Sequence, residues 1–119
     1  MKSLPTSAEL GFLKSKDLIL VSFAKYQVYL TFEDEIVITI EGLFRHVHGG
    51  CVDVGLENDA PVAESKLMRL IGHQIIELDL KGQGDLELSF SNEDTLLIFR
   101  DAEPYESYHI RWAEKEIHV

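Results

Sequence analysis

The feature that most limits the fold of this chain is a series of short stretches in which apolar and polar side chains alternate. In "VYLTF" (28–32) every second side chain is apolar, and "IVITI" (36–40) repeats the pattern. A period of two residues, rich in β-branched and aromatic side chains, is typical of β-strands. The acidic triplet "EDE" (33–35) between them has the length of a hairpin turn. With "LILVSF" (18–23) before them, these stretches predict an antiparallel meander of three strands.

Further strands are predicted near 44–47, 74–80, 86–90, 95–100 and 108–112. Turn signals separate them: Gly49-Gly50, "KGQGD" (81–85) and "SNED" (91–94). In the last strand Tyr108, Ile110 and Trp112 are expected to face the core. The fold class that follows is mainly β (α+β): two related antiparallel meanders forming a sandwich or a strongly bent sheet.

One or two short helices are expected beside the strands. The better one runs from Pro61, which suits a first turn, to Gly72, which suits a C-terminal end, with Asp59 as a possible cap. Its buried stripe would be Val62, Leu67, Leu70 and Ile71. A second short helix could lie within residues 3–13, where Gly11 interrupts it early.

The second half of the chain echoes the first. "LTF" (30–32) and "LSF" (88–90) each precede a polar turn and then an apolar strand. We therefore expect one domain over residues 1–119 with an internal repeat, about 18–58 and 62–112. The alternative is that any two β-hairpins resemble each other.

Charge is the strongest signal in the composition. The chain has 21 acidic and 11 basic residues, a formal charge of −10. The phosphate backbone of a nucleic acid would be repelled, whereas a basic protein would be attracted and its association accelerated. The alternative explanation is solubility alone. No apolar run approaches a membrane span, the N-terminus lacks a signal-peptide core, and Cys51 is the only cysteine, so we expect a cytoplasmic protein without disulfides.

Candidate chemistry is sparse. "HVHGGC" (46–51) combines two histidines and Cys51 at a spacing that can bind zinc, with Asp53 and Glu57 as further oxygen ligands, but the second cysteine of a structural site is missing. A Cys–His nucleophile would lack an orienting third residue. The acids of the two turns resemble glycosidase carboxylate pairs only in composition, since exposed carboxylates keep ordinary acidity. We therefore expect no enzyme, no cofactor and no metal.

The sequence resembles a family of small bacterial proteins without an assigned activity. The resemblance covers about residues 26–112 and rests on "YQVYLTFEDEIVITIEGLF", on "LMRLIGHQIIELDLKGQGDLELSFSNEDTLLI" and on "PYESYHI". Such proteins are often encoded beside secreted or contact-delivered toxins. The resemblance therefore implies an immunity protein that binds and neutralises a cognate toxin.

An inhibitor of a basic toxin, with a nuclease as the expected class, would use acidic groups around aromatic anchors. The expected partner-binding residues are Asp101, Glu103, Tyr105 and Glu106, followed by the turns with Glu33, Asp34 and Glu35 and with Glu93 and Asp94. The two turns are expected to lie near each other if a two-fold axis relates the repeats. The alternative is a non-enzymatic structural module that oligomerises through a sheet edge.

Overall fold

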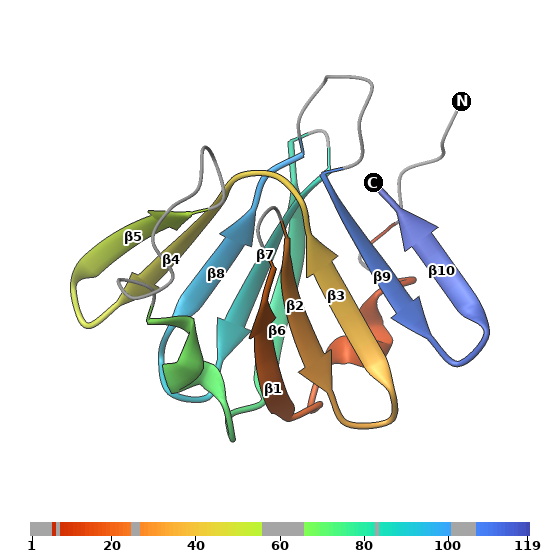
Figure 1. Cartoon of the computed structure of the whole chain (residues 1–119), viewed down its shortest axis with the longest axis horizontal. Helices are drawn as coiled ribbons and strands as arrows, with labels where there is room; N and C mark the ends of the chain where they lie inside the picture. The colour runs from red at the N-terminus through yellow and green to blue at the C-terminus, as the bar shows by residue number, and fades with distance from the viewer. Residues whose placement is uncertain (1–5, 7, 25–26, 56–65, 83, 101–106) are drawn as a thin grey trace.

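A computed structural model describes residues 6, 8–24, 27–55, 66–82, 84–100 and 107–119 of the chain. They form two five-stranded antiparallel sheets, packed face to face at their centre and splayed toward their far edges (Figure 1). The predicted fold class, mainly β with two packed antiparallel meanders, is confirmed. No helix in the described ranges has the length and apolar character needed to cross a membrane.

The first sheet has the order β1-β2-β3-β9-β10. Its strands are β1 (Leu18–Phe23), β2 (Val28–Phe32), β3 (Ile36–Ile40), β9 (Tyr108–Trp112) and β10 (Lys115–His118). The second sheet has the order β5-β4-β8-β7-β6. Its strands are β5 (Cys51–Gly55), β4 (Phe44–His48), β8 (Thr95–Ile98), β7 (Asp85–Phe90) and β6 (Ile75–Lys81).

In the described ranges two short 3₁₀ helices, η1 (Gly11–Leu13) and η3 (Leu67–Leu70), precede β1 and β6, the strands that open the two meanders. The described part of the helix predicted between Pro61 and Gly72 is therefore a single 3₁₀ turn. Ile71 was wrongly predicted to be buried: it follows η3 and is 36% exposed. The rest of that prediction, including its cap and first turn, lies outside the described residues.

Each sheet combines three strands from one half of the chain with two from the other. In residues 8–55 the meander β1-β2-β3 is followed by the hairpin β4-β5, and in residues 66–119 the meander β6-β7-β8 is followed by β9-β10. Each hairpin leaves its own meander and pairs with the last meander strand of the other half. The halves thus exchange their hairpins.

Backbone hydrogen bonds between the halves are reciprocal. Ser15 N donates to Ile75 O at 2.7 Å, and Gly72 N donates to Leu18 O at 2.8 Å. Leu18 therefore corresponds to Ile75, and Ser15 to Gly72. Ser15 and Gly72 also share a left-handed backbone, with φ of 71° and 89°. We call residues matched in this way equivalent.

The hairpins obey the same correspondence. Glu41 N donates to Ser107 O at 2.8 Å, and Phe99 N donates to Leu43 O at 3.0 Å. β9 is therefore equivalent to β4 residue by residue, and each meander also begins with a bulge, after Leu18 in β1 and after Ile75 in β6. Strand order and hydrogen bonding have two-fold pseudosymmetry, while the duplication of the sequence stays a prediction.

The core lies between the facing sheets and is closed by the two 3₁₀ helices. Equivalent leucines of the 3₁₀ segments are fully buried, as are the equivalent rings that end β2 and β7: Leu10, Leu13, Leu67, Leu70, Phe32 and Phe90. Each half therefore contributes the same apolar set to one shared core. The buried rings of Phe32 and Phe90 directly precede the β2–β3 and β7–β8 turns.

Candidate functional site

Nine residues were predicted to bind a partner, and the structure describes five of them. Asp101, Glu103, Tyr105 and Glu106 lie outside the described residues. Glu33, Asp34 and Glu35 form the β2–β3 turn, and Glu93 and Asp94 end the β7–β8 turn.

The two turns lie at the same end of the molecule, the lower edge in Figure 1. Glu33 N donates to Asp17 O at 3.0 Å, and Ser91 N donates to Gln74 O at 2.9 Å. Asp17 and Gln74 in turn pair with each other in an isolated antiparallel bridge between the sheets. We call this surface the acidic end; its carboxylates are Asp17, Glu33, Asp34, Glu35 and Glu93.

The first turn is held by its own acidic side chains. Glu33 Oε1 accepts a hydrogen bond from Asp17 N at 3.1 Å. Lys16 Nζ donates to Asp34 Oδ2 at 2.5 Å. The hydrogen bond to Asp34 raises the pKa of Lys16; desolvation opposes the rise, and the charges of Asp34 and Glu33 add to it. Glu35 is exposed, so it is the carboxylate of this turn most available to a partner.

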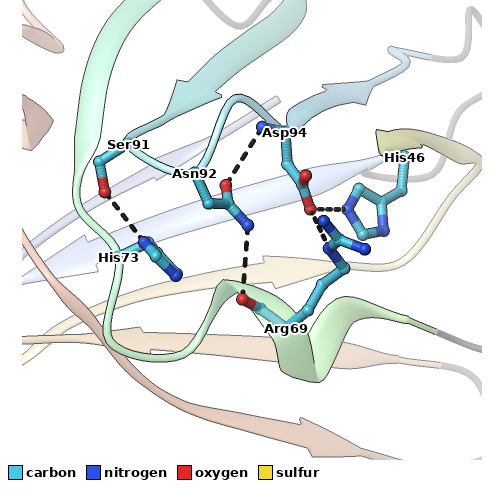
Figure 2. A network of polar contacts seen from close by, with 6 residues as sticks. All are labelled: His46, Arg69, His73, Ser91, Asn92 and Asp94. Atoms are coloured by element: carbon cyan, nitrogen blue, oxygen red, sulfur yellow. Dashed lines mark hydrogen bonds and ion pairs between the residues drawn. The ribbon is translucent and has the colours of Figure 1, made fainter. Parts of the chain in front are cut away.

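The second turn is held by a network of polar contacts (Figure 2). Ser91 Oγ accepts from Gln74 N at 3.2 Å, the equivalent of the bond that Glu33 makes. Asn92 Oδ1 accepts from Asp94 N at 3.1 Å, and Asn92 Nδ2 donates to Arg69 O at 3.5 Å. The turn is thereby tied to η3, and Glu93 at its tip is exposed.

Glu35 and Glu93 occupy equivalent positions and share an unusual backbone. Their φ angles are 61° and 72°, in the left-handed region that costs an L-residue about 1–2 kcal/mol. Glycine would adopt this conformation without strain. Asp34, Ser15 and Ala113 share this backbone region, so the conformation belongs to the turns and places both glutamates at exposed positions.

Replacing Glu35 or Glu93 by glycine is therefore expected to leave stability unchanged or raise it by up to about 1 kcal/mol each. Urea unfolding of each variant measures this. Glu114→Gly is the control, because the turn strain between β9 and β10 falls on Ala113 (φ 51°) rather than on Glu114. A loss of more than about 1 kcal/mol at Glu35 or Glu93 would show that these side chains hold the turn instead.

Asp94 is placed differently from the other carboxylates of the turns. Its side chain is 1% exposed, and its Oδ2 lies 2.8 Å from His46 Nε2 and 2.9 Å from Arg69 Nε. Arg69 is half exposed, so its guanidinium extends from the buried carboxylate toward the surface. Asp94 therefore holds the end of the second turn through its buried contacts with His46 and Arg69. Its carboxylate is too deeply buried to contact a partner directly.

The pseudosymmetry shows that the fold does not require this charged group. Phe90 N bonds to Asp94 O as Phe32 pairs with Ile36, so Asp94 is equivalent to an isoleucine. All three charged or ionisable residues of the group have apolar equivalents in the other half, which are Ile36, Ile110 and Phe12. At one pseudosymmetric position the space is filled by the apolar side chains of Ile36, Ile110 and Phe12. At the other it holds the network of Asp94, His46 and Arg69.

The two histidines of "HVHGGC" are both buried and packed together, with ring centroids 4.6 Å apart. His48 is equivalent to Trp112, whose ring packs on Phe12 at 4.5 Å. Within the described ranges no three His, Cys, Asp or Glu side chains are arranged to hold a metal ion. Both rings are therefore buried, and His46 belongs to the network through its contact with Asp94.

Other carboxylates lie on the outer face of β6 and β7: Glu77, Asp79, Asp85 and Glu87. Two of them have lysine partners, since Lys14 Nζ lies 3.6 Å from Glu77 and Lys81 Nζ lies 3.2 Å from Glu87. The two lysines therefore neutralise two of the four negative charges on this face. At the acidic end Lys16 is the single lysine paired with a carboxylate among the described residues.

No protein-family model, curated protein or solved structure matches this chain. The candidate site is therefore defined by its geometry: two acidic turns at one end, the second supported by Asp94, Arg69 and His46. Sequence reasoning missed Arg69 and His46 as supports of the turn. It also missed Asp17, which precedes β1 and becomes part of the acidic end only through the bridge to Gln74.

Proposed function

We propose that this protein is an immunity protein that binds a basic protein toxin and neutralises it by covering the cationic surface with which the toxin holds its substrate. A nuclease is the toxin class we expect, because cleaving a nucleic acid requires positive charge against the phosphates. A rigid acidic end would compete for that charge.

The observation that carries the proposal is the gathering of both acidic turns at one end of the molecule. Five carboxylates face one lysine there, and Glu35 and Glu93 project from turns fixed by hydrogen bonds. A turn whose backbone is already held loses less conformational entropy on binding. The formal charge of −10 adds long-range attraction, which accelerates encounter with a cationic partner.

The test uses the product of the gene adjacent to the one encoding this protein, as purified toxin and as a toxin expressed in cells. We expect Glu35→Lys/Glu93→Lys to lower the association rate by roughly tenfold or more at low salt, and to remove protection of the cells. The loss should shrink as salt rises.

The matched control is Asp79→Lys/Glu116→Lys, which makes the same charge change at exposed positions on β6 and β10. It should slow association far less, because these residues lie outside the acidic end. If both double variants slow association equally, the net charge of the protein would explain toxin binding, and the acidic end would have no special role. Absence of any binding by the unaltered protein would refute the proposed function itself.

A further inference from the structure

One corner of the molecule exposes four apolar side chains, and at two of these positions the equivalent corner exposes charges instead. Ile19 and Leu20 of β1 are 55% and 50% exposed, and Met68 and Ile71 of the η3 segment are 61% and 36% exposed. η3 lies beside the start of β1 (Figure 1), where Gly72 N donates to Leu18 O. We call this surface the apolar corner.

Its equivalent in the other half carries an ion pair. Ile71 is equivalent to Lys14 and Leu20 to Glu77, and Lys14 Nζ lies 3.6 Å from Glu77 Oε2 with both side chains well exposed. The fold therefore accepts solvated charges at these two positions and brings them into contact. Exposed leucine and isoleucine at the same positions are not a requirement of the backbone, and clustered exposed apolar side chains are a feature of interaction surfaces.

The neighbouring surface is also unlike its equivalent. On the outer face beside Leu20 the first sheet presents Ser22 and Tyr29, paired across β1 and β2. The equivalent pair on the second sheet is Asp79 and Glu87. The apolar corner thus continues into an uncharged strip, which lets two copies of a chain with charge −10 approach closely without setting carboxylates against each other.

No strand in the described ranges pairs with the outer edge of β1 along this strip. In its sheet β1 pairs with β2 alone, and among the described residues the backbone hydrogen bonds from β1 to the turn after η3 involve Leu18 only. An open edge is a template for another strand, and an antiparallel pair of identical edges is self-complementary. Asp17, which belongs to the acidic end, directly precedes β1. In an antiparallel β1–β1 pair the acidic ends of the two copies therefore lie at opposite ends of the paired strands.

We infer that the apolar corner and the β1 edge form a homodimer interface in which β1 of one copy pairs antiparallel with β1 of the second. The inference does not depend on the proposed function, since it concerns a different surface. It leaves the acidic end of each copy free for a partner.

The test is sedimentation velocity of the purified full chain over a range of concentrations. We expect the unaltered protein to form dimers that become tighter as salt rises, because salt screens the repulsion between two acidic copies. Leu20→Glu/Ile71→Lys installs the ion pair of the equivalent corner and should weaken dimerisation by roughly tenfold or more. Its thermal unfolding should equal that of the unaltered protein at concentrations low enough for both to be monomers. Ile19→Lys, on the same edge, should act alike if the double variant fails to fold.

The matched control is Ile76→Lys, since Ile76 is equivalent to Ile19 and is 48% exposed on β6. It should dimerise as the unaltered protein does. A monomer at every concentration would overturn the inference and leave the apolar corner to a different protein. Dimers that persist in both corner variants, or that Ile76→Lys disrupts equally, would overturn it as well.

Discussion

Replacing Asp94 alone by isoleucine is expected to destabilise the protein by about 2–3 kcal/mol, although isoleucine is the residue found at the equivalent position. The substitution removes the carboxylate that accepts from His46 and Arg69. His46 is 1% exposed and loses a charge-assisted hydrogen bond in a buried place. Arg69 is half exposed and can turn to water, which keeps the loss at or below the lower limit of the range of about 3–5 kcal/mol for broken buried pairs.

Replacing all three residues together should have a much smaller effect. Asp94→Ile/His46→Ile/Arg69→Phe copies the apolar set of Ile36, Ile110 and Phe12 into the second half. Well-packed apolar replacements of buried ion pairs are often neutral or stabilising. We expect the triple variant to unfold within about 1 kcal/mol of the unaltered protein, or at higher urea.

Urea unfolding of the single, double and triple variants measures the coupling among the three side chains. The control is Asp79→Ile, which removes a carboxylate from an exposed position on β6 and should change stability by less than about 0.5 kcal/mol. A triple variant less stable than Asp94→Ile alone would mean that the two halves pack differently despite their matching hydrogen bonds. A stable triple variant with weakened toxin binding would assign the network to positioning Glu93.

Stability is expected to fall at alkaline pH through Tyr108. This side chain is fully buried, and its hydroxyl donates to the Gly84 carbonyl at 2.8 Å. Burial raises the pKa of Tyr108 well above its ordinary value; the charge of Asp85 adds to the rise and that of Arg100 opposes it. The folded state therefore keeps the phenol proton at a pH where the unfolded chain releases it.

The sign of the effect follows from this difference in proton binding. Below about pH 10 the hydroxyl is protonated in both states, and its contribution to stability is complete. Above that pH the free energy of unfolding should fall by about 1.4 kcal/mol per pH unit from this group.

Tyr108→Phe removes the titration and serves as the comparison, with denaturant unfolding measured between about pH 8 and pH 11. The variant should lose about 1 kcal/mol at pH 8 with the hydrogen bond to Gly84. Its ring should fit, because the equivalent residue is Phe44, also buried. The two proteins should converge in stability as the pH rises past about 10; parallel curves would exclude Tyr108 as the source of alkaline instability.

The strands of the two meanders could be predicted because their pattern is local. Alternation in 28–32 and 36–40, and the turn between them, appear in the structure at those positions. β5 and β10 were not predicted, because β5 directly follows the Gly49-Gly50 turn and β10 is four residues long and half charged. The exchange of hairpins could not be predicted. The pairing of β3 with β9 joins segments distant in sequence, and strand alternation does not show which strand pairs with which.

The placement of Asp94 was missed for a different reason. An acidic residue after a turn is normally solvated, and that expectation was applied to Asp94 as it was to Glu93. The sequence did hold a signal: setting "FEDEI" above "FSNED" aligns Asp94 with Ile36, whose alternation with Ile38 and Ile40 predicts burial. A buried position in one repeat predicts a buried position in the other, and hence a partner for the carboxylate.

The exchanged hairpins also determine when and how this chain can acquire its structure. The first sheet lacks two of its five strands until residues 108–118 have been synthesised, so a nascent chain on the ribosome cannot complete it. Neither half can unfold alone without stripping strands from both sheets. Unfolding should therefore be cooperative across the whole chain, and folding should be slow for its size because the decisive pairings join residues distant in sequence.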